Sequence, residues 1–178
     1  SFQYTISNAN GSSTATVTIF EDPAPEDQSI DLLLEVQDLE GNPISQVDIG
    51  DEFLLVASVQ DRRAIAENRA GIYAIYMDVL FERGLVSAVF DVDNPLGFAV
   101  TFADEYDNAT SGDVNTPGLL DEIGSIQTTI GAPLGSSLLE VFQVVFTATE
   151  AGLVTFLGDP ADVRPSHDIL YYDPPEVA

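Results

Sequence analysis

Apolar residues recur at every second position through most of this chain. Successive side chains of a β-strand point to opposite faces, so such a stripe fills one face of a strand. The longest stripe runs over residues 73–81, with Asp78 at an intervening position. Short alternating runs rich in Val, Ile, Phe and Tyr predict strands rather than helices. The stripes are Ile30, Leu32, Leu34 and Val36; Phe53, Leu55, Ala57 and Val59; Tyr73, Ile75, Met77, Val79 and Phe81; Phe98, Val100 and Phe102; Phe142, Val144, Phe146 and Ala148; and Leu153, Thr155 and Leu157.

Turn residues separate the stripes. Gly41-Asn42-Pro43, Gly50-Asp51, Asp93-Asn94-Pro95 and Gly158-Asp159-Pro160 all combine residues that interrupt regular structure. Many short strands with such punctuation are typical of an all-β sandwich or jelly roll. We therefore predict an all-β, jelly-roll β-sandwich.

The first part of the chain has a different character. Residues 1–22 form an alternating segment with a central turn at Asn8-Ala9-Asn10-Gly11, which predicts a β-hairpin extension. An acidic, proline-containing linker is expected at 23–29, and the sandwich at 30–178.

The charge of the chain restricts its partners. Thirty Asp and Glu against five Lys and Arg give a formal net charge of −25. Such a surface repels phosphate backbones and anionic lipid, so neither nucleic acid nor a membrane is an expected partner. No apolar run reaches the length of a membrane span, and the absence of Cys excludes disulfides and thiolate metal sites.

Catalysis has little support in the sequence. His167 is the only histidine, and it stands between Ser166 and Asp168. Neighbouring residues of a strand face opposite ways, so these three cannot form a triad among themselves. A pair of carboxylates suited to glycoside hydrolysis could be found among so many acids, but no motif marks one. We predict that the chain is not an enzyme.

Calcium is the one cofactor that the sequence suggests. Clustered acids supply the oxygen ligands that this hard cation prefers, on segments expected to be loops. The alternative is an acidic, solvated surface, which is common at this charge. The candidate metal residues are Asp91, Asp93, Asp104, Glu105, Asp107 and Asp113.

The N-terminal hairpin is the candidate for assembly. An extended segment can add to an exposed sheet edge, where backbone hydrogen bonds provide affinity and alternate side chains provide specificity. The candidate contacts for strand addition are Phe2, Tyr4, Ile6, Val17 and Ile19. The alternative is that the hairpin belongs to a preceding domain and folds back or lies free.

Two longer segments of the sequence resemble known protein families. The segment FQYTISNANGSSTATVTI at 2–19 resembles the closing hairpin of cadherin-like or immunoglobulin-like repeats of bacterial surface proteins. Residues 30–172 are similar to cohesin-like domains of large secreted bacterial proteins, through FLLVASVQD, GIYAIYMDVLFE, LLDEIG and VFQVVFTATEAGLVTFLGDPADVRPSHD. This resemblance implies a jelly-roll sandwich without an active site, located outside the cell or on its surface. The acidic stretch 103–118, which we expect to be a loop, departs from the cohesin pattern.

Two functions are therefore expected, with different partners. In the first, the chain is a non-catalytic structural or adhesive module that assembles with copies of itself or with adjacent modules into a surface fibre. In the second, it is a cohesin-type module that binds a dockerin-like protein or a carbohydrate with the help of calcium.

Overall fold

The protein is built almost entirely from β-strands. The computed structural model describes residues 2–8, 11–17, 30–63, 71–129, 134–161 and 169–171. The strands are β1 (Phe2–Asn8), β2 (Gly11–Val17), β3 (Ile30–Gln37), β4 (Glu52–Asp61), β5 (Ile72–Leu80), β6 (Val86–Ala88), β7 (Val100–Phe102), β8 (Asn108–Asp113), β9 (Leu119–Ile126), β10 (Leu139–Ala148), β11 (Leu157–Pro160) and β12 (Ile169–Tyr171), with one 3-10 turn, η1 (Asp104–Tyr106). The predicted all-β class is confirmed.

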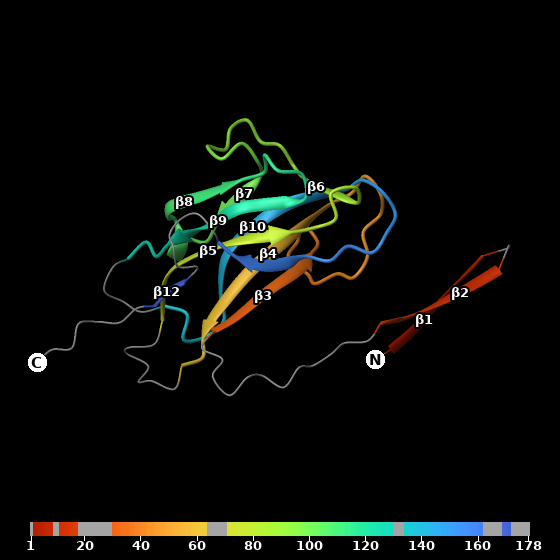
Figure 1. The fold of residues 1–178 in the computed structure, drawn as a ribbon, viewed down its shortest axis with the longest axis horizontal. Helices are drawn as coiled ribbons and strands as arrows, with labels where there is room; N and C mark the ends of the chain where they lie inside the picture. Colours follow the sequence, from red (N-terminus) through yellow and green to blue (C-terminus); the bar gives the residue numbers. More distant parts are fainter. Residues whose placement is uncertain are drawn as a thin grey trace, which may run out of the picture.

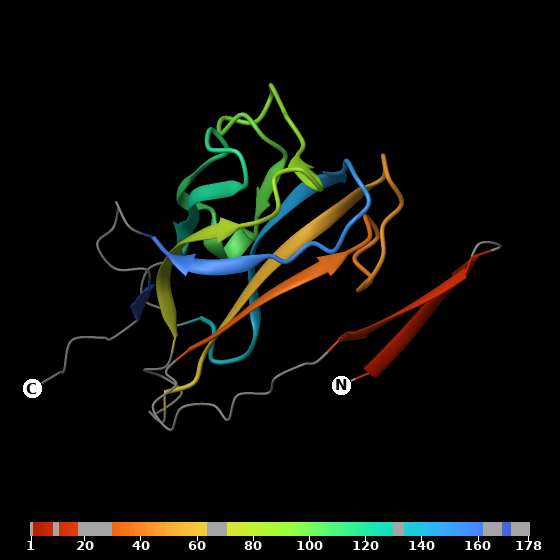
Figure 2. The same cartoon turned by 45° about the vertical axis from the view of Figure 1, so that its right-hand side comes forward.

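Two antiparallel sheets face each other (Figure 1). The β4–β10 sheet has the order β3-β4-β10-β6, and β7 also pairs with β10. The β5–β9 sheet has the order β11-β5-β9-β8, and β12 also pairs with β5. At one side of the sandwich β11 of the second sheet lies beside β3 of the first (Figure 2). The predicted β-sandwich is therefore confirmed.

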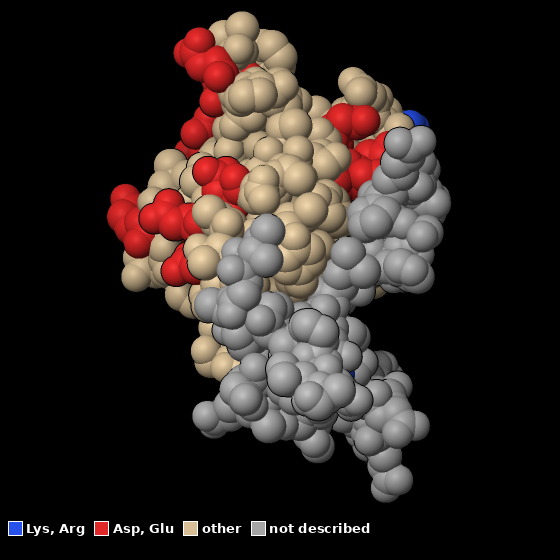
Figure 3. All heavy atoms as spheres, turned by 90° about the vertical axis from the view of Figure 1, so that its left-hand side faces the viewer, with Lys and Arg blue, Asp and Glu red and all other residues tan. Residues whose placement is uncertain are grey.

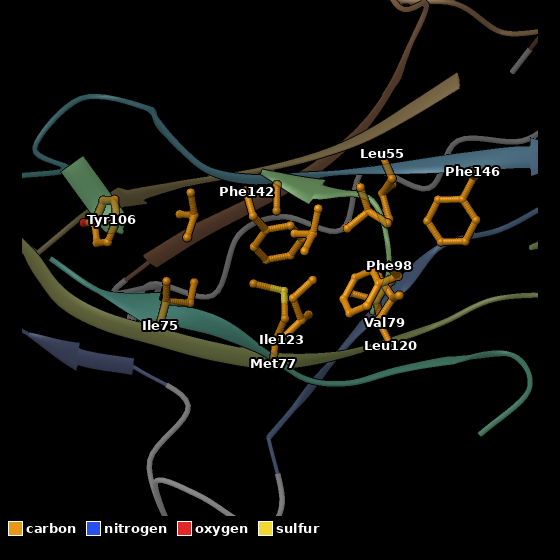
Figure 4. Packing of buried hydrophobic residues seen from close by; sticks show 14 of the residues in the cluster. Leu55, Ile75, Met77, Val79, Phe98, Tyr106, Leu120, Ile123, Phe142 and Phe146 are labelled. Atoms are coloured by element: carbon orange, nitrogen blue, oxygen red, sulfur yellow. The ribbon is translucent and has the colours of Figure 1, made fainter. Parts of the chain in front are cut away.

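The core lies between these two sheets, where the alternating stripes predicted from sequence meet (Figure 4). From β4, Leu55, Ala57 and Val59 are fully buried, and from β5 Ile75 and Val79 face them. Aromatic rings fill one end of this layer: Phe81 and Phe146 make an edge-to-face contact at 5.0 Å. Interdigitation of side chains from two sheet faces is what holds a sandwich together.

A buried tyrosine fixes the other end of the core. Tyr106 of η1 is completely buried, and its hydroxyl donates a hydrogen bond of 2.7 Å to the carbonyl oxygen of Ile72. Burial raises the pKa of this phenol, with a smaller contribution from Glu105. Its role is structural, because a buried hydroxyl that has a partner stabilises the packing around it.

The carboxylate of Asp61, at the end of β4, binds residues at both ends of the connection between β4 and β5. It accepts hydrogen bonds from Arg63 Nη2 at 2.8 Å and from the backbone N–H of Gly71 at 2.6 Å. Burial by itself would raise the pKa of Asp61. The bonds from the Arg63 side chain and from the backbone of Arg63 and Gly71 outweigh burial and hold that pKa below its ordinary value of 3.8.

Two expectations about the strands are wrong. Residues 103–118 are not one loop, because they contain η1 and the edge strand β8. The sequence of β8, NATSGD, has no apolar stripe to reveal it. In the last stripe the residues facing the core are Val154 and Phe156 rather than Leu153 and Leu157, and the strand begins only at Leu157.

The predicted N-terminal hairpin is confirmed. β1 and β2 pair antiparallel in a two-stranded sheet of their own, with Phe2 opposite Val17 and Asn8 opposite Gly11. The predicted linker at 23–29 lies outside the described residues, and the domain boundaries stay a prediction.

Candidate binding face

Three leucines form a continuous apolar row on the outer face of the β5–β9 sheet. Leu80 of β5 lies opposite Leu157 of β11 on one side and Leu119 of β9 on the other. Val79 and Leu120, the strand neighbours of Leu80 and Leu119, are fully buried in the core. Because side chains alternate along a strand, the three leucines point outward. We call Leu80, Leu119 and Leu157 the leucine row.

The leucine row is exposed to solvent at one end. Leu157 is 60% exposed and Leu80 is 41% exposed, while Leu119 is half-buried. Single exposed apolar residues are ordinary on a protein surface, but aligned neighbours expose a contiguous apolar area. The row therefore presents a surface that gains free energy when another molecule covers it.

A shallow hollow adjoins the leucine row. It has a volume of about 260 Å³ and is lined by Leu80, Phe81, Glu82, Thr155 and Leu157. The Glu82 carboxylate accepts a hydrogen bond of 2.8 Å from the backbone N–H of Thr155, which holds the two walls together. The size and apolar lining suit an inserted aliphatic side chain rather than a substrate that must be enclosed for chemistry.

A row of carboxylates follows the leucine row. Asp78 lies opposite Asp159 on β11, and on its other side β9 places Asp121 and Glu122. One carboxylate oxygen from each of Asp78, Asp121 and Glu122 lies within 4.8 Å of the others. We call these three residues the acid group. It is the one group of this kind in the part of the chain that the structure describes.

A β-bulge explains why these acids meet. The register between β5 and β9 shifts between Met77 and Val79, and Glu122 has a positive φ of 52°. The extra residue leaves a backbone N–H without its ladder partner. Asp78 is buried over this bulge, and its Oδ1 accepts that N–H of Glu122 at 2.7 Å. The acid group has oxygen ligands of the kind a hard cation takes, but this bond gives Asp78 a structural role.

The predicted metal residues lie elsewhere. Asp91 and Asp93 occupy the β6–β7 connection, where Asp91 Oδ1 accepts the backbone N–H of Asp93 at 2.9 Å. Asp113 ends β8 and accepts the backbone N–H of Asn115 at 2.8 Å. The remaining three lie on or next to η1: Asp104, Glu105 and Asp107. The structure does not bring these six into a common group of three or more, and calcium binding stays a prediction.

The other sequence candidates have the following places. Phe2, Tyr4 and Ile6 lie on β1 and Val17 ends β2. Ile19, and the run 166–168 that contains the single histidine, lie outside the described residues. The role of the hairpin in assembly stays a prediction.

Tyr76 and Tyr106 provide no platform on which a sugar could stack. Tyr76 is buried, and its hydroxyl donates a hydrogen bond of 2.7 Å to the carbonyl oxygen of Ala109. Burial raises the pKa of this phenol, and neighbouring Tyr73 adds to the effect. Tyr106 is buried as well. A ring on which a sugar stacks must be open to solvent, so these two are excluded.

Acidic residues gather in groups on the face that Figure 3 shows. In the view of Figure 3, Asp and Glu form several separate groups on the described surface, and they dominate among the charged residues. In the described part of the chain no helix has the length and apolar character that a membrane span needs.

No protein-family model matches the chain, and no curated protein is similar to it in sequence. The structure is similar to solved structures of cohesin–dockerin complexes. Two are type I complexes from Clostridium thermocellum. The Coh-OlpA-Doc918 complex has 11% identity, covers 74% of this chain and 84% of that chain, and has a TM-score of 0.48. The Coh-OlpC-Doc435 complex has 12% identity, covers 77% and 83%, and has a TM-score of 0.46.

A third similar structure is the complex of CaCohA2 with a variant of CaDoc0917, with 15% identity, 73% and 82% coverage, and a TM-score of 0.46. At these scores the fold assignment rests on the strand order and pairing of this chain. The likeness of the N-terminal hairpin to cadherin-like repeats stays a prediction.

Proposed function

We propose that the sandwich is a non-catalytic, extracellular protein-binding module that uses the outer face of the β5–β9 sheet. The leucine row carries this proposal: three aligned, outward leucines on a sheet face beside a shallow apolar hollow. The class of partner implied by the sequence resemblance is a dockerin-like protein.

The chemistry of this face favours a protein over a carbohydrate. Burial of aliphatic side chains against another protein is favourable, while sugar recognition by a sheet face depends on exposed aromatic rings and polar contacts. The adjacent carboxylates of Asp121, Glu122 and Asp159 favour a partner that brings Lys or Arg next to its apolar residues.

The test is a titration with two matched variants. Leu80→Ser combined with Leu157→Ser removes the exposed part of the leucine row, and Leu33→Ser removes a leucine that is 43% exposed on the other sheet. Isothermal titration with a purified dockerin module is expected to show binding by the native chain and Leu33→Ser, and at least a tenfold weaker affinity for the double variant, a loss of about 1.4 kcal/mol. Equal affinities for all three proteins would contradict the proposed face.

The second candidate function is assembly with other copies or adjacent modules into a surface fibre by strand addition. It is favoured by the pairing of β1 with β2 in a separate two-stranded sheet, since a lone hairpin is only marginally stable in water. Deletion of residues 1–22 is expected to abolish oligomers and leave the sandwich folded. An unchanged molar mass by light scattering, with and without the deletion, would reject assembly.

Calcium assistance is part of the proposal for partner binding. It is supported by the acids on the connections of the sandwich, among them Asp91, Asp93 and Asp107. A flat response of the melting temperature to calcium and to chelator would remove the cation from the proposal.

A further inference from the structure

Each of the two sheets ends in edge strands, and an edge strand offers unpaired backbone groups to any other strand. In the β4–β10 sheet the edges are β3 and the pair β6 and β7. In the β5–β9 sheet they are β8 and the pair β11 and β12. Only an edge with a long, regular stretch of free groups can accept another strand.

Three of these edges are interrupted. β6 and β7 have three residues each and are separated by the connection 89–99. β8 has two register shifts, and Ala109 within it has a positive φ of 49°. β11 and β12 have four and three residues, and β11 ends in Pro160. Bulges, short strands and proline are the features by which proteins protect sheet edges.

β3 has none of these interruptions. Its eight residues pair with β4 in one continuous register, and its sequence IDLLLEVQ contains no Pro, Gly or Lys. Leu32 and Leu33 in its middle are 38% and 43% exposed. The most regular free edge of the described sandwich is therefore also apolar.

The alternation of backbone hydrogen bonds between β3 and β4 shows which backbone N–H and C=O groups of β3 point away from β4. The N–H of Asp61 donates to Gly135 at 2.7 Å, so Asp61 directs its backbone away from its β3 partner Ile30. Even-numbered residues of β3 therefore direct their backbone groups to the free side. Consistent with this, Val36 accepts a bond of 3.0 Å from the N–H of Ile44. Among the described residues, no backbone group forms a hydrogen bond with Leu32 or Leu34 on that side.

The N-terminal hairpin has the properties of a donor for this edge. Residues 1–20 contain no charged residue, in a chain with a net charge of −25. Two copies repel each other strongly, and this segment can approach a second copy without adding to the repulsion. Its alternating apolar residues match the strand period. The following segment EDPAPED carries two prolines and four acids, a composition typical of linkers with long reach.

We infer that the free edge of β3 accepts one strand of the N-terminal hairpin of a second copy, with hydrogen bonds to the backbone of Leu32 and Leu34. This inference rests on the second candidate function and adds the acceptor edge to it. A donor hairpin and an acceptor edge on every copy produce a head-to-tail contact, which leads to chains rather than closed dimers unless the rotation closes a ring.

The absence of native cysteine makes a direct test possible. A donor carries Tyr4→Cys in β1, an acceptor carries Leu33→Cys in β3, and a control acceptor carries Thr110→Cys in the exposed β8 edge. Donor and acceptor have different affinity tags, are mixed, and are treated with a short bis-maleimide that tolerates small differences in register. A covalent heterodimer is expected with Leu33→Cys and none with Thr110→Cys.

The other outcomes distinguish an error in the β3 acceptor edge from an error in the proposed assembly itself. A heterodimer with Thr110→Cys, or oligomers in light scattering without any crosslink to Leu33→Cys, would overturn the β3 edge and leave assembly intact. If the double variant Tyr4→Cys with Leu33→Cys links only within one chain and the protein stays monomeric, the hairpin folds on its own sandwich and both are wrong.

Discussion

Removal of the Asp61 carboxylate is expected to destabilise the sandwich more than any exposed acid would. Asp61→Ala removes the carboxylate that the guanidinium of Arg63 binds at 2.8 Å, and the N–H of Gly71 loses the acceptor at 2.6 Å. The Asp61 side chain is fully buried and that of Arg63 is 23% exposed. Breaking a buried pair costs about 3–5 kcal/mol, and partial solvation of Arg63 lowers the expected loss to about 2–4 kcal/mol.

The matched control is Asp31→Ala. Asp31 makes an ion pair of 3.3 Å with Arg62, and the two side chains are 39% and 51% exposed. Exposed pairs of this kind contribute below about 1 kcal/mol. Urea unfolding of the native chain and both variants measures the difference directly. Equal losses for the two variants, or a loss below about 1 kcal/mol for Asp61→Ala, would refute the role assigned to burial.

The ion pair between Asp61 and Arg63 also makes the free energy of unfolding depend on pH. The pKa of Asp61 is lower in the folded state than its ordinary value of 3.8, so the native state favours the charged form. Its contribution is fully present above the unfolded pKa and is lost as the pH falls through the folded pKa. The stability difference between the native chain and Asp61→Ala is therefore expected to be constant near neutral pH and to shrink below about pH 4. A difference that is independent of pH down to strong acid would contradict this assignment.

Three further predictions follow from other residues. Gly124→Ala places a Cβ against the backbone of Ile75 and Tyr76; a loss of about 1–3 kcal/mol or more is expected in urea unfolding, against no change for Gly84→Ala, which meets nothing within 4 Å. Tyr106→Phe removes the bond to Ile72 and is expected to lower the free energy of unfolding by about 1–2 kcal/mol without changing the far-ultraviolet spectrum; a neutral effect would show that the hydroxyl is not needed. Added calcium is expected to raise the melting temperature and chelator to lower it, if the loop acids bind the ion; scanning calorimetry in both conditions decides this.

The central strands were predictable because their residues obey a local rule. In β4, Phe53, Leu55, Ala57 and Val59 are all nearly or fully buried, as their alternation indicates. β8 was missed because a short edge strand has no buried face that must be apolar. Leu153 and Leu157 were assigned to the wrong face because the connection before β11 is irregular, and a change of one position exchanges the two faces.

The candidate face could not be predicted from the sequence. The leucine row depends on the register of three strands that are distant in the chain, and no local pattern encodes that register. The acid group depends on a single extra residue in β9, which turns Asp121 and Glu122 towards Asp78. The sequence shows Asp78 within an apolar stripe, and it shows Asp121 and Glu122 within LLDEIG. Neither pattern indicates that these acids lie close together.

The pairing of β4 with β10 has a consequence for how the protein forms. Phe53 and Phe146 are opposite each other in the sheet, although about half of the residues of the chain lie between them. Until β10 has been made, β4 lacks the strand that pairs with its second edge. Non-local pairing of this kind slows folding, so β4 keeps an unpaired edge while the residues between β4 and β10 are synthesised. Repulsion between the strongly negative chains then opposes their aggregation while folding is incomplete.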